Sequence, residues 1–175
     1  VPPTYGMYEV SANINNVQVK KVPLTPAFQL DLPALEAAVD DHTKIIFLCS
    51  PNNPTGNSLI REEVELLLNN YYGLVVMDEA YINFSRQRSY VQELEDYPNL
   101  VVLQTLSKAW GLAALRVGMA FASEAIIEVM NKIKPPYNIN QASQELVLKA
   151  LDEVGQVNEM IRVIVQERTR LEVEL

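Results

Sequence analysis

Cysteine, histidine and long apolar runs are scarce in this sequence. The single cysteine, Cys49, cannot form an internal disulfide, and a reducing cytoplasm is the compartment we expect. The single histidine, His42, lies in the polar turn DDHT and belongs to no ligand-spaced cluster, so a metal centre lacks support. No apolar stretch is long enough to span a bilayer, and no signal peptide is visible.

Positive charge is also in short supply. The chain carries 14 Lys and Arg residues against 22 Asp and Glu residues, for a net charge of −8. This balance argues against a nucleic-acid or anionic-membrane partner. It still allows a phosphorylated small ligand, because a few local cations or backbone amides hold a phosphate. With 175 residues, 49% of them hydrophobic, the chain is long enough for one domain with a real core.

Short apolar runs of strand-forming residues alternate with helical patterns along the chain. The patterns predict strands over residues 16–24, 44–49, 74–77, 99–104 and 116–122. They predict helices from about residue 32, over 61–72, over 123–134, and from 140 towards 175 with a weak point at Gly155. Strands that alternate with helices imply right-handed crossovers, so the expected fold class is α/β with a mainly parallel sheet flanked by helices.

Local signals mark several helix ends. Asp31 is expected to cap the helix that begins at residue 32, with Pro33 in its first turn. Gly73 is expected to close the 61–72 helix as its C′ residue. Ser123 is a candidate N-cap for the helix over 123–134.

Three of the apolar runs lead directly into polar motifs. KIIFLC leads into SPNNPTG (50–56), LVVM into DEAY (78–81), and NLVVLQ into TLSKAWGLAALRVG (105–118). If these runs are parallel strands, Asn53, Asp78 and Lys108 emerge at one edge of a sheet, where ligands of open α/β sheets bind. An amide, an acid and an amine around one crevice suit pyridoxal 5′-phosphate (PLP), which needs a Schiff-base lysine and an acidic partner for its ring nitrogen.

Each of these side chains also has an ordinary structural explanation. Taken alone, Lys108 is more typical of a surface lysine, and Asp78 of a helix N-cap or a metal ligand. Asn53 is otherwise a turn residue. Tyr81, three residues after Asp78, faces the same pocket if DEAY begins a helical turn, and otherwise only packs. The order of the motifs, each at a strand end, favours the cofactor interpretation.

Hydroxyl and guanidinium groups flank Lys108. Thr105, Ser107 and Arg116 have the chemistry of a phosphate cradle, since arginine binds oxyanions in a bidentate fork. Arg116 is otherwise a surface ion-pair partner. Tyr5, in PPTYGMY, has a ring that would stack on a planar ligand, and is otherwise a core aromatic near a helix start.

The motifs PPTYGMY, SPNNPTGN, DEAYINF and TLSKAWGLAALRVG, supported by KPPYNIN, resemble those of the fold-type I PLP-dependent aminotransferases. The resemblance covers the whole chain and is greatest to the members that act in histidine biosynthesis. It implies a PLP-binding large domain of the aspartate aminotransferase type, incomplete, over residues 1–155. Residues 156–175 would form a long helix leading towards a small C-terminal domain. The resemblance also implies a homodimer and an amino-acid or phosphorylated small-molecule substrate.

The resemblance assigns a role to each candidate site residue. Lys108 would form the Schiff base and move a proton, while Asp78 would pair with the pyridine nitrogen. Asn53 and Tyr81 would hydrogen-bond the ring oxygen, and Tyr5 would stack on the ring. The phosphate would be held by Thr105, Ser107 and Arg116.

Parts that the family uses lie outside this sequence: an upstream phosphate-binding segment, the small domain, and a tyrosine of the partner subunit. We therefore expect an internal piece of a longer protein that is inactive alone. Three alternatives stay open at this point. They are another enzyme of the same fold (an aromatic aminotransferase or a threonine-phosphate decarboxylase), a PLP-sensing domain of a transcription regulator, and a noncatalytic α/β domain.

Overall fold

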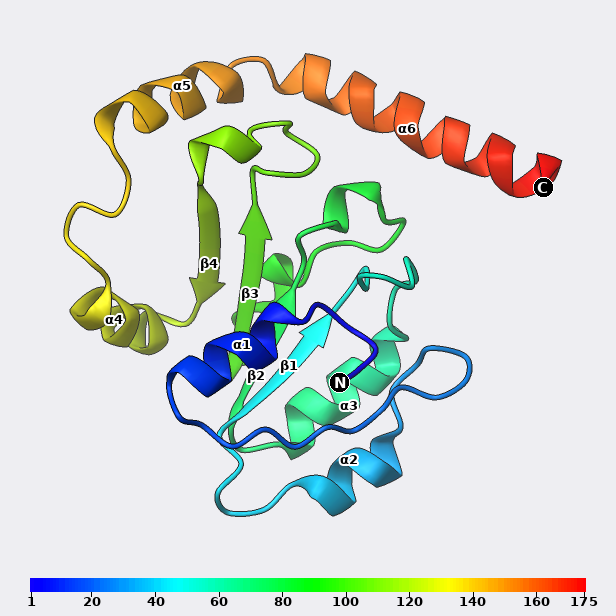
Figure 1. Ribbon diagram of the computed structural model, residues 1–175, viewed down its shortest axis with the longest axis vertical. Helices are drawn as coiled ribbons and strands as arrows, with labels where there is room; N and C mark the ends of the chain where they lie inside the picture. Colours follow the sequence, from blue (N-terminus) through cyan, green and yellow to red (C-terminus); the bar gives the residue numbers. More distant parts are fainter.

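A four-stranded sheet forms the centre of the molecule, shown in Figure 1 as a computed structural model that describes all residues, 1–175. Its strands are β1 (Ile45–Cys49), β2 (Leu74–Asp78), β3 (Leu100–Thr105) and β4 (Gly118–Ala122), in that spatial order. The first three run parallel, whereas β4 returns antiparallel to β3. The prediction of a mainly parallel α/β sheet is therefore confirmed.

The two central strands are apolar on both faces. Val75, Met77, Leu100 and Val102 have no exposed surface. Together with side chains from β1, α3 and the flanking loops they form one core cluster of 15 buried residues. Continuous apolar runs of this kind are typical of parallel strands that are covered on both sides. Their removal from water is the main force that holds the sheet and its covering segments together.

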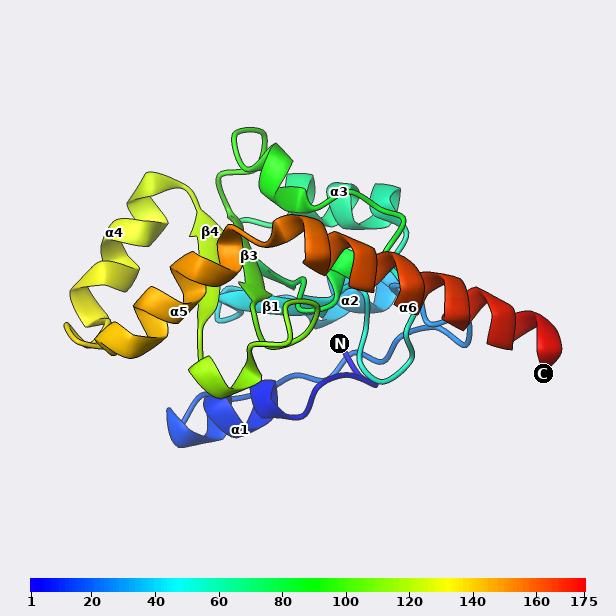
Figure 2. The ribbon, with the colours of Figure 1, turned by 90° about the horizontal axis from the view of Figure 1, so that it is seen from above.

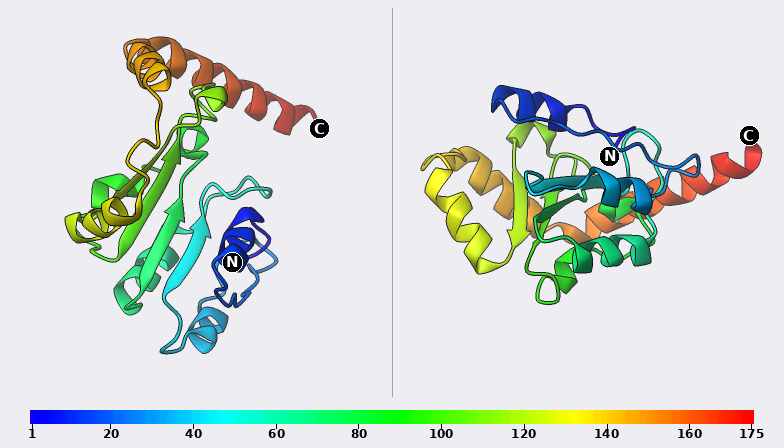
Figure 3. Two further views of the ribbon diagram at one scale, coloured as in Figure 1. Left: turned by 60° about the vertical axis from the view of Figure 1, so that its left-hand side comes forward. Right: turned by 90° about the horizontal axis from the view of Figure 1, so that it is seen from below.

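Helices surround the sheet. They are α1 (Met7–Ile14), α2 (Leu32–Ala38), α3 (Arg61–Asn70), α4 (Glu124–Ile133), α5 (Gln141–Leu151) and α6 (Val154–Glu174). Short 3₁₀ turns are η1 (Ile82–Phe84), η2 (Tyr90–Glu93) and η3 (Ala113–Leu115). Figures 2 and 3 show α1 and α3 on opposite faces of the sheet. In Figure 1, α5 and α6 extend beyond the end of the sheet at which β3 ends.

The start of α2 and the end of α3 test the residues that were predicted to cap helices. Asp31 caps α2 as predicted, since its Oδ1 accepts a hydrogen bond of 3.0 Å from the Ala34 amide. The prediction for Gly73 is wrong, because the chain already leaves α3 in an extended conformation at Tyr71. Gly73 is needed for space instead. A Cβ there would lie 2.3 Å from the Tyr71 hydroxyl and 2.7 Å from the Lys44 carbonyl oxygen.

The predicted strand over residues 16–24 is not formed. The segment has no regular secondary structure, and Val17 and Val19 are exposed. It follows α1 through Asn16, which has a left-handed φ of 52°. Its backbone is held to the rest of the molecule at its end, where the Leu24 amide donates to the Pro2 carbonyl at 2.7 Å. β propensity alone does not make a strand when no neighbouring strand edge completes the ladder.

The C-terminal third also differs from its prediction in one detail. The break between α5 and α6 falls at Asp152 and Glu153, and Gly155 lies inside the first turn of α6. Ser123 does precede α4, but its side chain makes no capping bond and donates to the Pro98 carbonyl at 3.3 Å. None of the helices is both long and apolar enough to cross a membrane.

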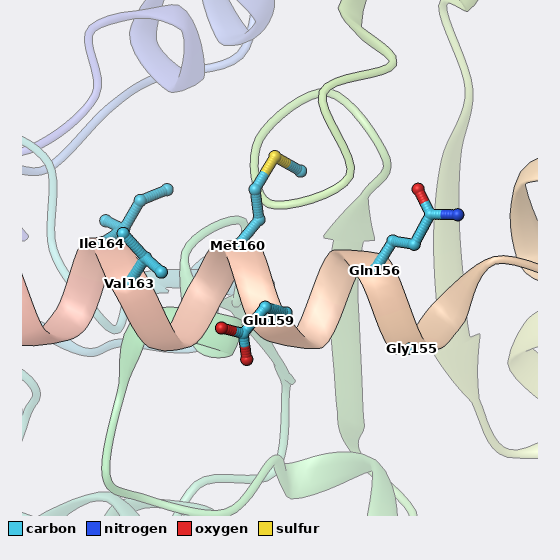
Figure 4. A pocket seen from close by; sticks show the side chains of 6 residues that line it. All are labelled: Gly155, Gln156, Glu159, Met160, Val163 and Ile164. Carbon is cyan, nitrogen blue, oxygen red and sulfur yellow. The ribbon is translucent and has the colours of Figure 1, made fainter.

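The helix α6 has little of its surface covered. A hydrogen bond of 3.1 Å from the Arg168 guanidinium to the Phe84 carbonyl ties it to η1. An open pocket of about 530 Å³ is lined only by residues of α6. Figure 4 shows Gln156, Met160 and Ile164 pointing to the same side of the helix. This spacing of four residues is that of one helix face.

Candidate active site

β1 and β2 end at the same level of the sheet, and β3 runs two residues further, to Thr105. Cys49 pairs with Asp78, and Asp78 pairs with Leu103. The loops that leave these positions carry the three motifs found in the sequence. The expectation that the motifs emerge side by side at the carboxyl edge of one parallel sheet is therefore confirmed. This edge is the usual ligand-binding edge of open α/β sheets.

Asp78 is the last residue of β2, and both of its carboxylate oxygens are engaged by this chain. Oδ1 accepts from the Ala80 amide at 3.0 Å, and Oδ2 accepts from the Tyr8 hydroxyl. No cation pairs with it. A carboxylate oxygen has two lone-pair sites, so each oxygen of Asp78 retains capacity for one further donor.

Lys108 lies in the loop after β3 and is exposed, with its ammonium 5.2 Å from the ring centroid of Tyr81. An ammonium at that distance from a phenol ring is attracted by the ring quadrupole. Its Nζ takes part in no salt bridge and donates no hydrogen bond within the chain. The structure thus brings together two predicted site residues that come from different loops, and it leaves the amine free of a protein partner.

The predicted phosphate-binding residues lie in one connection. Thr105 ends β3 and pairs with Gly118 of β4, so the loop between them folds back beside its own start. The Thr105 hydroxyl accepts from the Ser107 amide at 3.1 Å and donates to the Val117 carbonyl at 3.3 Å. Arg116 has a left-handed backbone, with φ 58° and ψ 41°, and its guanidinium donates to the Ala113 carbonyl at 2.9 Å. Thr105, Ser107 and Arg116 thus belong to one β3–β4 connection, and Arg116 is exposed.

Asn53 lies in the loop after β1 and is half-buried. With Tyr81 it lines a polar cavity of about 820 Å³ that reaches Arg86 and Arg168. Its neighbour Asn52, which no sequence pattern distinguishes, is the buried anchor of the loop. The Asn52 side chain donates to the Pro3 carbonyl at 2.9 Å and accepts from the Thr4 hydroxyl at 3.0 Å. These bonds attach the N-terminal segment with Tyr5 to the loop that carries Asn53.

Tyr5 is 48% exposed and packs edge-to-face on Tyr8, with ring centroids 5.7 Å apart and an interplanar angle of 84°. Tyr8 was not among the predicted site residues, yet its hydroxyl reaches Asp78 from α1. The available signal was the spacing of three residues between two tyrosines at a helix start, which places both on one face. Tyr5, Tyr8 and Asp78 therefore form a continuous chain of contacts at the edge of the sheet.

Glu79 was also missed, and it is buried on the other side of the strand end. It is 1% exposed, and it accepts hydrogen bonds from the Ser89 hydroxyl (2.5 Å), the Tyr90 amide (2.8 Å) and the Gln104 amide group (2.9 Å). Successive residues of a strand point to opposite faces, so Asp78 and Glu79 have separate tasks. Glu79 holds the β2–β3 connection, which contains Tyr81, against β3.

Burial changes the chemistry of two groups near Asp78. Burial raises the pKa of the Tyr8 phenol far above its ordinary value, and the hydrogen bond to Asp78 raises it further. Burial also raises the pKa of the Cys49 thiol. Both groups therefore stay protonated at neutral pH, and Asp78 has a permanent hydroxyl donor. His42 is exposed in its turn, and no group of three or more metal-ligating side chains occurs.

The family described as "Aminotransferase class I and II" matches residues 1–175 of the chain. The histidinol-phosphate aminotransferase of Cytophaga hutchinsonii is 58% identical over 175 residues, which are 100% of this chain and 50% of that protein. The enzyme of the same name from Parabacteroides distasonis is 55% identical over 172 residues, covering 98% of this chain and 50% of that protein. The chain thus spans about half the length of the curated relatives it matches.

A solved structure gives a similar result for the fold. The crystal structure of histidinol-phosphate aminotransferase from Sinorhizobium meliloti, in complex with pyridoxal 5′-phosphate, superposes with a TM-score of 0.86 at 25% sequence identity. The match covers 96% of this chain and 47% of that one.

Proposed function

The chain belongs to the class I and II aminotransferases, and from that membership we propose that it is part of a histidinol-phosphate aminotransferase. The reaction would transfer an amino group between L-histidinol phosphate and 2-oxoglutarate with pyridoxal 5′-phosphate as cofactor. Identity of 58% to a curated enzyme of that name, over the whole of this chain, supports the substrate. The observation that carries the chemistry is the unpartnered Lys108 amine beside Tyr81, at the sheet edge where Asp78 ends β2.

The side chains at this edge fit the cofactor group by group. The two oxygens of Asp78 keep acceptor capacity for a cationic ring N–H, and the exposed Tyr5 ring is available for stacking. Asn53 and Tyr81 line the same cavity and offer an amide and a phenol to a ring oxygen. Two hydroxyl side chains and one guanidinium of the β3–β4 loop suit a phosphate: Thr105, Ser107 and Arg116.

Pyridoxal phosphate supplies an electron sink that stabilises negative charge at the substrate Cα. Lys108 Nζ is the group of this chain that would take the Cα proton and return it, since a neutral amine is both a base and a nucleophile. The Asp78 carboxylate would keep the ring nitrogen protonated, because an adjacent negative charge favours the charged form of a base. Arg116 would hold the phosphate by charge-assisted hydrogen bonds.

The domain arrangement, the assembly and the location are proposals of the same kind. We infer a cofactor-binding unit over residues 1–155 and a helix over 156–175 that leads towards a further domain. A homodimer follows from the family, and the cytoplasm is proposed from the single cysteine. A PLP-sensing domain of a transcription regulator is less favoured, since the chain carries an excess of acidic residues over basic ones.

A labelling experiment on the full-length protein tests the central role of Lys108. After incubation with pyridoxal phosphate and reduction with borohydride, peptide mapping is expected to find the adduct on Lys108. Lys108→Ala is expected to lose the adduct and all turnover while the melting temperature changes little, because the side chain is exposed and unpaired. An adduct on another lysine, or turnover by Lys108→Ala, would contradict the proposal.

Substrate comparison separates the proposed enzyme from its relatives. Histidinol phosphate with 2-oxoglutarate is expected to give a higher kcat/KM than tyrosine or phenylalanine as amino donor. Threonine phosphate is expected to release no carbon dioxide. A preference for an aromatic donor, or decarboxylation, would assign the chain to another branch of the same fold.

A further inference from the structure

Tyr8 contacts the Asp78 carboxylate directly, and none of the cofactor roles above uses it. It is the second residue of α1, and Asp78 lies 70 residues further along the chain at the end of β2. In Figures 2 and 3, α1 lies on the face of the sheet opposite to α3. The helix therefore brings a hydroxyl to the strand end from outside the three motif loops.

Two aromatic neighbours fix the Tyr8 ring. It stacks on Phe47 of β1 with ring centroids 5.1 Å apart and an interplanar angle of 20°. Tyr5 packs edge-to-face with it at 5.7 Å. Both arrangements are favourable for aromatic pairs. A ring held in this way fixes the position of its hydroxyl, and it also supports the ring of Tyr5.

The carboxylate of Asp78 is held at both oxygens. The Tyr8 hydroxyl donates to Oδ2, and the Ala80 amide donates to Oδ1 at 3.0 Å. Rotation of the carboxylate would break at least one of these bonds. Hydrogen bonds to an ionised acceptor are about twice as strong as neutral ones, so this orientation is well defined.

The donor role of Tyr8 does not depend on pH in the neutral range. Burial, and then the hydrogen bond to Asp78, raise the pKa of the phenol far above its usual value. The other titratable group that acts on Tyr8 is Cys49, whose own pKa is raised by burial. The hydroxyl therefore keeps its proton at neutral pH.

We propose that Tyr8 is a positioning residue of the active site, whose hydroxyl holds the Asp78 carboxylate in place to receive the cationic N–H of a heteroaromatic ring. The inference rests on the proposed function, and it adds to the site a residue on α1 that lies outside the strand-end loops. The hydroxyl also disperses part of the negative charge of Asp78, and so it sets how strongly that carboxylate favours a cation.

The test is Tyr8→Phe in the full-length protein, which keeps the ring and its stacking and removes only the hydroxyl. Tyr71→Phe is the matched control, because Tyr71 is buried at the end of α3 and its hydroxyl has no hydrogen-bond partner. The measurements are the absorbance of the bound cofactor as a function of pH, together with kcat and KM.

When the Tyr8 hydroxyl is removed, the Asp78 carboxylate loses a hydrogen-bond donor and its negative charge acts more strongly on nearby groups. The pH midpoint of the cofactor absorbance is expected to move up by about half a unit in Tyr8→Phe, because a stronger negative charge favours protonated forms nearby. The kcat is expected to fall on the order of tenfold with KM nearly unchanged, as is common when an orienting partner of a reactive centre is lost. Tyr71→Phe is expected to match the wild type in all three measurements.

Three results discriminate the hypotheses. An unchanged midpoint and kcat in Tyr8→Phe would overturn the positioning role. A lower kcat without a spectral shift would overturn it too, since a packing defect explains that result. A wild-type protein without a cofactor absorbance band would instead refute the proposed function.

A measurement without cofactor tests the contact itself. The phenol of Tyr8 is followed by NMR in protein labelled with ¹³C at tyrosine Cζ, with Tyr8→Phe used to assign its resonance. The Cζ chemical shift at neutral pH is the readout, because the phenol stays protonated there. Asp78→Asn is expected to move the Tyr8 Cζ shift, because the hydrogen bond from the hydroxyl to an anion is lost. A Tyr8 Cζ shift that Asp78→Asn leaves unchanged would show that the two side chains are not bonded, and would overturn the inference.

Discussion

At the scale of single residues, neighbouring positions in this chain have sharply different tasks. Asp78 and Glu79 are both acids at the end of β2, yet Asp78 turns to the candidate site while Glu79 is buried in hydrogen bonds from three groups. Asn52 and Asn53 both line the cavity, but Asn52 is buried as an anchor whereas Asn53 is half-buried. In each pair the buried member fixes the backbone that presents the other.

Glycine residues give a stability prediction at this scale. Gly73→Ala is expected to destabilise the protein by about 1–3 kcal/mol, because its Cβ would overlap the Tyr71 hydroxyl and the Lys44 carbonyl. Gly155→Ala is the control, since nothing lies within 4 Å of the new Cβ in α6. That change is expected to stabilise by roughly 0.5–1 kcal/mol. Urea unfolding midpoints of both variants check the pair, and equal midpoints would show that the close approach at Gly73 is absent.

At the scale of elements, the β2–β3 connection contains no α-helix, and hydrogen bonds and ion pairs hold it in place. The segment holds only the 3₁₀ turns η1 and η2, and Glu79 anchors its start. Near its end Glu93 is paired with Arg61 of α3 and with Arg88, and the Arg61 guanidinium lies 4.1 Å from the ring centroid of Tyr90. Tyr81, beside Lys108, is therefore presented by a loop that buried acids hold at both ends.

Helix capping gives a prediction for the elements. Asp31→Ala is expected to destabilise by about 1 kcal/mol, because the Ala34 amide at the start of α2 loses its acceptor. Ser123→Ala is expected to cost less, since Ser123 makes no capping bond to α4 and loses only an exposed hydrogen bond to the Pro98 carbonyl. Thermal melts of the two variants measure the difference, and equal losses would contradict the capping assignment.

At the scale of the whole molecule, one sheet edge gathers side chains from most of the chain length. Tyr5 and Tyr8 come from the N-terminal segment, Asp78 and Tyr81 from the middle, and Lys108 from the loop after β3. The core beneath consists of buried apolar side chains and a few phenols. This composition has a consequence for stability at high pH.

Buried phenols predict a loss of stability in alkali. Burial raises the pKa of Tyr71 and Tyr90 in the folded protein, whereas an unfolded tyrosine titrates near pH 10. Above about pH 10 the unfolded chain therefore releases protons that the folded chain keeps, so the free energy of unfolding falls as the pH rises. Below that pH the two phenols are protonated in both states, so the free energy of unfolding keeps its full value. Urea midpoints at pH 8, 10 and 11 measure the slope.

A pair of phenylalanine variants checks the cause of this slope. Tyr90→Phe is expected to flatten it, because Tyr90 is 3% exposed in the folded protein. Tyr72→Phe is expected to leave it unchanged, because Tyr72 is fully exposed. A slope that is the same in both variants and in the wild type would mean that other groups cause the loss.

The sequence alone determined the positions of β1 to β4, the parallel order of β1 to β3, the Asp31 cap and the gathering of three motifs at one edge. The strands follow from local patterns of apolar residues, which have the period of the element that they form, and the cap follows from the residue type before the first helical turn. Only the tertiary structure decided that residues 16–24 form no strand, that β4 is antiparallel, that Gly73 is needed for space, and that Tyr8 reaches Asp78. Each of these depends on contacts between residues far apart in the chain, such as the 70 that separate Tyr8 from Asp78, and no local pattern records such a contact.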